Sequence, residues 1–490
     1  MTHITWIDGS MVGVYLLATM IAGIAVRKYV GKVEHFLVAG REMNVYLGIA
    51  SLAATEFGVV TCMYTAQNGY DKGFAGSTPG ILQAVAMLLV GLTGFCIKPL
   101  RDSGVMTIPE LFERRFGPRI RWAAGVVIVL GGLLNMGVFL RMGGEFLVTV
   151  CGFDAKYLEI TMTALLVAVA VYTILGGMLS VLVTDFLQFV VMSGGLIAVT
   201  LLILVNVGWD KLVSTVEAHH GAGGFNPFVN PTMGWSYVLF NALLNLGAVL
   251  TWQTTIQRVL SAKDTSTGRR IYTGTAFFFV CRFLIPGIWG IAALAMLAPG
   301  QIGGSSLNAM PMFLSTFVPV GLMGVLVAAM LAADMSTDSS YMLTWGSVIY
   351  NDILAPFRKT PWPEKKGLRW NRSIVALIGI FLLIYGLWYP LKGDLWTYLG
   401  VTGSIYLTSM STLLVACCYW KRANSWGAAG AIIFGALIPA LYLVLEQVPA
   451  TADFAKGKIG PYYSGIAAYV AAALAMVVGS LLKPSRKEAA

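Results

Sequence analysis

Charged residues are scarce in this 490-residue chain, where Asp, Glu, Lys and Arg together make up only 11% of the sequence. Soluble domains usually carry about 25% charged residues, so a chain this poor in charge could not cover a water-facing surface. Hydrophobic residues account for 57% of the chain and its mean hydropathy is +0.76, which excludes intrinsic disorder. The composition therefore predicts an integral membrane protein that has the lipid bilayer as its main solvent.

Cysteine and histidine are also few, with six and four residues. Most cysteines fall inside apolar runs and none has the spacing of a metal site, so we interpret them as small core residues. No histidine lies within an apolar run, which argues against a histidine proton relay across a membrane. The net charge of +10 indicates basic loops on one side of a membrane rather than nucleic-acid binding.

The chain contains thirteen apolar segments of about 18 or more residues, each long enough to cross a bilayer as a helix. They lie at 6–26, 45–69, 79–97, 122–150, 157–176, 180–207, 233–257, 272–298, 314–348, 373–391, 395–418, 427–446 and 462–482. Continuous runs of this length exclude a β-barrel, whose strands alternate over about ten residues. The predicted fold class is therefore an all-α polytopic membrane protein with about 13 transmembrane helices, and the first segment is interpreted as a membrane helix rather than a signal peptide.

Lys and Arg residues are distributed unevenly between the loops that connect these segments. With the N-terminus outside, the inside loops, among them 258–271, and the C-terminal tail hold 25 of them, whereas the outside segments hold six. Because basic loops stay on the cytoplasmic side, we expect a multi-pass protein of the plasma (inner) membrane with an outside N-terminus and a cytoplasmic C-terminus. The short tail after residue 482 leads us to expect no attached soluble domain, such as a sensor kinase.

Seven ionisable residues fall deep inside the predicted spans, where each costs at least about 2.5 kcal/mol to insert and therefore needs a function or a partner. They are Glu56, Arg141, Glu145, Asp185, Arg282, Asp334 and Asp338. Arg141 and Glu145 lie four residues apart on one helical face, which is compatible with an internal ion pair or with a substrate-binding role. Asp185 opens the sixth span, where it could cap a helix or complete a cation site.

Two of the spans are interrupted by polar and small residues. Residues 53–58 combine alanines, a carboxylate and a glycine, which indicates either unwound helix with free carbonyls or an ordinary packing face. A second interruption occupies 245–247 and 252–255 in the seventh span. These spans begin corresponding blocks of five spans, 45–207 and 233–418, and paired interruptions of this kind predict an inverted-repeat transporter with its site near the bilayer midplane.

The ninth span contains an oxygen-rich stretch, residues 332–340. Ser336, Ser339 and Ser340 are spaced so that their hydroxyls share one helical face, and Thr337 and two aspartates lie beside them. Hydroxyl and carboxylate oxygens are hard ligands that suit a small cation such as Na⁺ and do not suit a soft metal. The alternative, in which serines bond back to their own helix, explains fewer of these residues.

Five short stretches carry a resemblance that covers nearly all of the chain. They are Trp6–Asp8 with Tyr15, Phe36–Arg41, Tyr172–Gly177 followed by Thr184–Gln188, Ile256–Arg258 with Ala262 and Lys263, and Met335–Ser339. In this order they resemble the motifs of the sodium:solute symporter family. The resemblance implies a leucine-transporter-type fold in one transporter domain over 1–490, with an extra N-terminal helix at 6–26, inverted repeats at 45–207 and 233–418, and two C-terminal helices within 427–482.

The resemblance also implies where sodium, the only metal expected, would bind. The common site of the family falls on the carbonyls and hydroxyls of Ala54, Phe57, Ala333, Ser336 and Thr337. Some members hold a further sodium ion on an aspartate and serines, which in this chain would be Asp185, Ser336, Ser339 and Ser340. Because all of these residues are present, we expect two sodium sites.

Eight residues are candidates for contacts with the solute: Glu56, Thr61, Gln83, Arg141, Trp252, Gln253, Arg282 and Asp334. Sugar-carrying members resemble this chain but have a lysine near Arg282 and an asparagine in place of Trp252, while proline carriers have an aspartate in place of Glu56. These differences favour a charged or zwitterionic solute, amino-acid-like or carboxylate-bearing, because an arginine could bind its carboxylate and a buried acid its amine. A sugar or a sialic-acid-type solute is the alternative.

The predicted function is sodium-coupled secondary active symport by alternating access, which imports a small organic solute and involves no enzymatic step. Its expected partners are the solute, sodium ions and the lipid bilayer, with no nucleic acid and no obligatory protein partner. Two other classes stay open at this point. A proton-coupled carrier of the same fold would use Glu56, Asp334 or Asp338 as its proton site. The other class is a non-transporting receptor, which would need a signalling partner, or a channel, whose conductance would show no fixed ratio of ion to solute.

Overall fold

Helices make up the fold in the computed structural model, which describes residues 4–298, 300–358, 360, 362–389 and 393–483. No strand occurs within these ranges, where one isolated β-bridge joins Met43 to Ala262. The principal helices are α1 (Trp6–Ala25), α3 (Val45–Glu56), α4 (Val59–Lys72), α5 (Thr78–Thr93), α8 (Pro118–Met136), α9 (Phe139–Val150), α10 (Leu158–Asn206), α12 (Gly234–Thr251), α13 (Gln253–Ser261), α14 (Thr265–Met296), α16 (Leu322–Val348), α17 (Glu364–Trp388), α18 (Leu395–Tyr419), α19 (Ser425–Gln447) and α21 (Pro461–Leu482). The shorter α-helices are α2 (Val33–Val38), α6 (Ile97–Asp102), α7 (Ile108–Phe116), α11 (Trp209–His220), α15 (Ala309–Phe317) and α20 (Pro449–Phe454).

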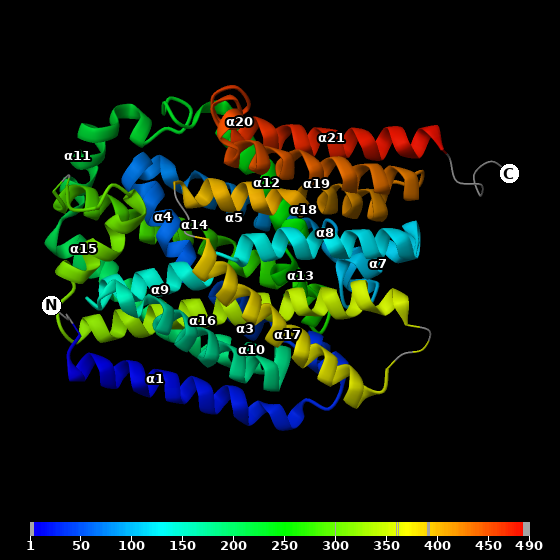
Figure 1. The fold of residues 1–490 in the computed structure, drawn as a ribbon, viewed down its shortest axis with the longest axis horizontal. Coiled ribbons are helices and arrows are strands. Elements are labelled where there is room, and N and C mark those ends of the chain that lie inside the picture. The colour runs from blue at the N-terminus through cyan, green and yellow to red at the C-terminus, as the bar shows by residue number, and fades with distance from the viewer. Residues whose placement is uncertain (1–3, 299, 359, 361, 390–392, 484–490) are drawn as a thin grey trace.

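Eleven helices in the described part of the chain are long and apolar enough to cross a membrane, which confirms the predicted polytopic class. Figure 1 shows the long helices extending along the longest axis, with α1 beginning at one end of the bundle and α21 ending at the other. The pair α19–α21 lies on the side of the bundle opposite to α1 (Figure 1). Large apolar side chains that are exposed on these two helices, such as Phe434 and Leu474, are suited to contact lipid.

The predicted count of thirteen transmembrane helices stays a prediction, because one helix is far longer than a single crossing requires. α10 has 49 residues, whereas about 20 suffice to span the hydrocarbon core. Its backbone is broken at Gly177, whose φ of 54° lies in the region that favours glycine. A Cβ at this position would also lie 2.5 Å from the ring of Phe36. The two arms of α10 on either side of Gly177 coincide with two of the predicted spans.

Two helices are broken inside the bundle, as the sequence predicted. Phe57 and Gly58 separate α3 from α4, and Phe57 has a non-helical φ of −118° and ψ of 73°. Trp252 separates α12 from α13 and is extended, with φ of −61° and ψ of 115°. A break of this kind ends the helical hydrogen-bond ladder and leaves carbonyl oxygens free within the protein.

α16 is the most buried of the eleven candidate spans among the described residues, with 89% of its apolar window inside the protein. α10 packs along it, and α1, α3, α8 and α9 cover its other sides. By contrast, only 33% and 28% of the windows of α19 and α21 are buried. The oxygen-rich stretch 332–340 therefore lies in the core of the molecule, next to the break between α3 and α4.

Candidate sodium and solute sites

The break between α3 and α4 lies directly against the middle of α16. Thr337 donates a hydrogen bond from Oγ1 to the carbonyl oxygen of Thr55 at 2.9 Å. A Cβ on Gly58 would lie only 2.7 Å from Thr337 Oγ1, so a glycine at this position permits the close approach. The residues of the predicted common sodium site belong to these two elements, and all of them are buried: Ala54, Phe57, Ala333, Ser336 and Thr337.

The oxygen atoms of these residues fit a small, hard cation. The bond that the Ala54 carbonyl accepts from the Phe57 amide is long, at 3.3 Å, because the helix ends there. Ser336 and Thr337 each donate one hydrogen bond, and a hydroxyl oxygen that donates still has lone pairs for a ligand. The five proposed ligand groups are therefore uncharged and would bind a cation through oxygen atoms alone, which are the ligands that hard cations prefer.

A fully buried arginine on α13 holds the aspartate that the sequence assigned to a second sodium site. Arg258 is 0% exposed, and its Nη2 lies 3.1 Å from Asp185 Oδ2. The same nitrogen donates to the hydroxyls of Thr55 and Ser340, each at 2.6 Å. Nε donates to the Ser51 hydroxyl at 3.1 Å. One guanidinium group thereby joins α3, α10, α13 and α16.

The four residues of the second predicted sodium site are brought together around this pair. Ser336 donates to Asp185 Oδ1 at 2.6 Å, and Ser340 accepts from Arg258. Ser339 donates to the Ser336 carbonyl of its own helix at 3.1 Å. The charge of Asp185 is therefore already balanced by a guanidinium. The sequence prediction that a loop begins at residue 258 is wrong, because α13 extends to Ser261 and buries this arginine.

A cavity lies between the two breaks, bordered by residues of both broken helices and of α5, α14, α16 and α18. The charged residues in its described lining are Glu56 and Arg282, whose Oε2 and Nη1 atoms are 3.4 Å apart. Glu56 Oε1 also accepts hydrogen bonds from the hydroxyls of Thr254 and Thr255, at 3.0 and 3.2 Å. The wall therefore presents a negative and a positive group side by side and carries no net charge.

Arg282 is held less tightly than Arg258. Its Nη1 is 3.2 Å from Gln83 Oε1, while its Nη2 is 3.4 Å from Thr61 Oγ1 and 2.9 Å from the Tyr64 hydroxyl. Its buried Nε has no hydrogen-bond partner among the residues that the structure describes. Because a carboxylate bonds a guanidinium at about 2.7–2.9 Å, this group retains the capacity to bind an anionic or polar ligand more strongly than its present partners.

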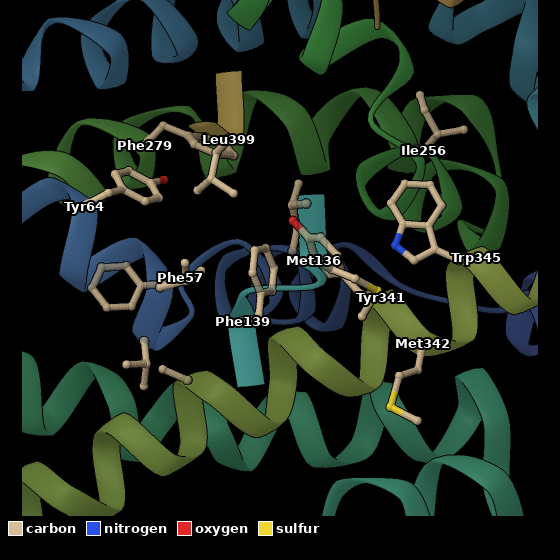
Figure 2. Close-up of a cluster of buried hydrophobic side chains, with 14 of the residues drawn as sticks. Phe57, Tyr64, Met136, Phe139, Ile256, Phe279, Tyr341, Met342, Trp345 and Leu399 are labelled. Carbon is tan, nitrogen blue, oxygen red and sulfur yellow. The ribbon is translucent and has the colours of Figure 1, made fainter. Parts of the chain in front are cut away.

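Aromatic side chains make up much of the cavity wall. The rings of Tyr64 and Trp396 have centroids 5.0 Å apart. Trp252, at the break of the second helix, donates from Nε1 to the Tyr341 hydroxyl at 3.0 Å and stacks on Tyr406 with centroids 5.6 Å apart. Figure 2 shows Tyr64 on α4 and Tyr341 on α16 within the same buried region. Such a wall offers flat apolar surfaces and a few directed polar groups, which is typical of a small-molecule site.

Five of the eight predicted solute contacts line this cavity: Glu56, Thr61, Gln83, Trp252 and Arg282. Arg141 does not, since it donates to Glu145 at 2.7 Å and to the Gly386 carbonyl at 3.0 Å, as the ion-pair alternative proposed. Gln253 and Asp334 are buried in the core but are not part of the lining.

Six polar residues that were not among the predicted solute contacts touch the charged pair or line the cavity: Tyr64, Asn135, Asn245, Thr254, Thr255 and Tyr341. Three of them, Asn245, Thr254 and Thr255, belong to the second interruption that the sequence predicted. The signal of the other three in the sequence is weak, because a single hydroxyl or amide in an apolar span is usually a core residue that bonds to its own helix. Arg258 carried a stronger signal. It follows an interrupted span, and Asp185 needs a positive partner if it is buried.

Comparisons with known proteins identify the family of the chain. The sequence profile of the sodium:solute symporter family matches residues 36–435. A sodium/glucose cotransporter 4 of Danio rerio is 27% identical, over 93% of this chain and 74% of that protein. A sodium/mannose cotransporter SLC5A10 of Bos taurus is 25% identical, over 98% and 87% of the two chains.

Solved structures show the same fold. A Na⁺-coupled sialic acid symporter in a substrate-bound, outward-open state is 18% identical and matches with a TM-score of 0.81, over 98% of this chain and 99% of that one. MhsT in complex with L-phenylalanine is 14% identical and matches with a TM-score of 0.53, over 90% and 98% of the two chains. Both likenesses concern the fold, whereas the profile match covers most of the chain. The chain therefore belongs to the sodium:solute symporter family, which consists of sodium-coupled secondary transporters and not of enzymes.

Proposed function

We propose that the protein imports a small polar organic solute together with Na⁺ across the plasma (inner) membrane by alternating access. The observation that carries this proposal is the break between α3 and α4. There the Thr55 carbonyl contacts Thr337 of the candidate sodium site, while the next side chain, Glu56, faces Arg282 in the cavity. Binding of Na⁺ at the break would therefore order the backbone that positions the charged pair for the solute.

The coupling follows from this shared segment. If Na⁺ raises the affinity for the solute, the solute must raise the affinity for Na⁺ by the same factor, because the two binding equilibria are linked. Each positive charge that moves inward across a membrane potential of 100 mV contributes about 2.3 kcal/mol to uptake, and the sodium concentration gradient adds to this driving force. The proposed orientation, with an outside N-terminus and a cytoplasmic C-terminus, places most basic loops on the cytoplasmic side.

For the solute, we propose a charged or zwitterionic compound, amino-acid-like or carboxylate-bearing. Its carboxylate would bind Arg282, whose Nε has no partner among the described residues and whose bonds to Glu56 and Thr61 are long, and an amine would approach Glu56. A second candidate class is a sugar or a sialic-acid-type compound. Two observations favour this class. The similar proteins include a sodium/glucose cotransporter and a sialic acid symporter, and the cavity wall carries no net charge and presents the aromatic ring of Trp252.

Uptake into proteoliposomes tests the proposal. The purified full chain is supplied with a panel of radiolabelled amino acids, organic acids, hexoses, inositol and sialic acid, with and without an inward Na⁺ gradient. We expect Na⁺-dependent accumulation of one of these classes, and matched compounds that lack only the amine or only the carboxylate then show which charge is required. Uptake driven by a proton gradient and indifferent to Na⁺ would contradict the sodium coupling and support the proton-coupled alternative.

A further inference from the structure

Two carboxyl groups of α16 belong neither to the cavity wall nor to the two candidate sodium sites described above. Asp334 and Asp338 lie one helical turn apart and are 3% and 1% exposed. Asp338 has no hydrogen-bond partner on either carboxyl oxygen, and Asp334 has none on Oδ2, among the described residues. Neither forms an ion pair with a Lys or Arg within those residues, whereas Asp185 and Glu56 each do. Burying a carboxylate without a partner costs several kcal/mol, so each of these groups must bind either a proton or a cation.

The positions of neighbouring residues show which side of α16 the pair occupies. Thr337 and Ser340 bond to Thr55 of α3, on the side of the common sodium site. Asp334 instead lies against α9, where a Cβ on Gly143 would come within 2.7 and 2.8 Å of its two carboxylate oxygens. The glycine thus lets the backbone of α9 approach the carboxylate closely, on a different face of α16 from the common site.

The charges of the buried core support a cation at this place. Glu56 is paired with Arg282 and Asp185 with Arg258, whereas no guanidinium among the described residues balances Asp334 or Asp338. Asp8 is also buried without a guanidinium, but two backbone amides donate to its carboxylate. The ligands of the common sodium site are neutral carbonyls and hydroxyls, so a Na⁺ bound there adds one positive charge. That ion and a second Na⁺ at the carboxyl pair would together balance the two carboxylates.

We propose that Asp334 and Asp338 together bind a second sodium ion, beside Gly143 of α9, and that this pair rather than Asp185 carries the second coupling charge. Carboxylate oxygens are suitable ligands for such a hard cation. The assignment rests on the proposed sodium-coupled function for its role in transport, although the binding itself does not require a solute. It also explains why the Asp185 carboxylate, which Arg258 already neutralises, is a poorer place for a further positive charge.

Equilibrium binding of radioactive Na⁺ to the purified full chain, with no solute present, tests this assignment. We expect about two sodium ions per wild-type protein and about one for Asp338→Asn and for Asp334→Asn, because each amide removes half of the site's charge. Gly143→Ala keeps both acids but places a methyl group at the carboxylate, and it should weaken one of the two sites at least about tenfold. Gly194→Ala on α10 is the matched control, since a Cβ there meets nothing within 4 Å.

Three results would overturn the proposal. Wild-type protein that binds a single Na⁺ has no second site. Two ions retained in folded Asp338→Asn, with one lost in Ser339→Ala, would move the second site to the residues around Asp185. If the aspartate variants do not give monodisperse protein, Gly143→Ala decides, and unchanged binding of both ions by it would reject the site. Absence of Na⁺-driven uptake alongside intact binding of two ions would instead contradict the proposed transport function.

Discussion

Two buried arginine–carboxylate pairs lie in neighbouring parts of the core and are held very differently. Arg258 and Asp185 are fully buried, and the guanidinium donates to Thr55 and Ser340 at 2.6 Å. Arg282 and Glu56 are 3.4 Å apart at a cavity wall, and part of this guanidinium has no partner among the described residues. The same residue types thus serve two purposes. A saturated pair fixes helices together, and a loosely bonded pair is available for a ligand.

Breaking the fully bonded Arg258–Asp185 pair should have the largest effect, and this effect is on stability. Arg258→Met leaves the Asp185 carboxylate buried without a positive partner, which costs about 3–5 kcal/mol in comparable buried pairs. We expect a strongly lowered melting temperature in detergent and a low yield of monodisperse protein. The double variant Arg258→Met with Asp185→Leu should recover part of this loss, because replacing both charges by apolar groups is often neutral. A single variant that melts like the wild type would show that the pair is not structural.

Breaking the Arg282–Glu56 pair should affect solute binding more than folding. Arg282→Gln removes the positive charge, but Glu56 keeps its hydrogen bonds from Thr254 and Thr255, so we expect the melting temperature to fall less than in Arg258→Met. Solute affinity should fall by about tenfold to a hundredfold, which corresponds to the loss of one charged hydrogen bond of about 1.5–3 kcal/mol. Competition uptake measures this change.

Arg141→Gln is the control for that measurement. This arginine bonds to Glu145 and to the Gly386 carbonyl away from the cavity, so its loss should leave solute affinity unchanged. If Arg141→Gln lowers the affinity and Arg282→Gln does not, the assignment of the two arginines is reversed.

The two pairs also show what the sequence can predict and what it cannot. The breaks at 53–58 and at Trp252 were predictable, because small and polar residues interrupt apolar runs there. The oxygen-rich stretch of α16 was predictable for the same reason. The location of Arg258 was missed, because counting basic residues assigns an arginine near the end of a span to a loop. The need of a buried Asp185 for a positive partner pointed to such a residue, and the path of α13 shows that Arg258 fills this place.

Sequence spacing likewise left the function of Arg141 open, because an ion pair and a binding role both suit residues four apart. Which of the two applies depends on the helix that covers the Arg141 face of α9, and this is α17, whose Gly386 carbonyl accepts a bond from Arg141. α10 shows the opposite case, since its sequence predicted two spans, 157–176 and 180–207, and the backbone is broken between them at Gly177. Local pattern sufficed for this break, whereas tertiary contacts decided the location of Arg258 and the partners of Arg141.

A smaller effect is expected at the sodium site that adjoins both pairs. Thr337→Ala removes one of the five proposed oxygen ligands and also the bond to the Thr55 carbonyl. We expect the Na⁺ concentration for half-maximal uptake to rise by about tenfold, equivalent to about 1.4 kcal/mol. Thr337→Ser keeps the hydroxyl and should remain close to the wild type. Equal sodium dependence in the alanine variant would remove Thr337 from the proposed ligand set.

The smallest effect is expected at a third pair, which lies partly exposed at the start of α18. Lys72 donates to Asp394 Oδ2 at 2.8 Å, and the Asp394 side chain is 30% exposed. Burial acts to raise the pKa of Asp394, but the charge of Lys72 and the bonds from Lys72 and Thr397 outweigh it, so its pKa lies below the usual 3.8. Solvent screening limits what such a pair contributes, in contrast to the fully buried one.

The sign of the pH dependence follows from this lowered pKa. Because the folded protein binds the proton of Asp394 more weakly than the unfolded chain does, the pair stabilises the protein above the usual carboxyl pKa, and the stabilisation disappears as the pH falls through the lowered value. Asp394→Asn should therefore melt slightly below the wild type at neutral pH, and the two melting curves should converge below about pH 4. Equal melting temperatures of the two proteins at neutral pH would instead mean that Asp394 acts through the bond that it accepts from the Thr397 amide, which asparagine can also accept, and not through its charge.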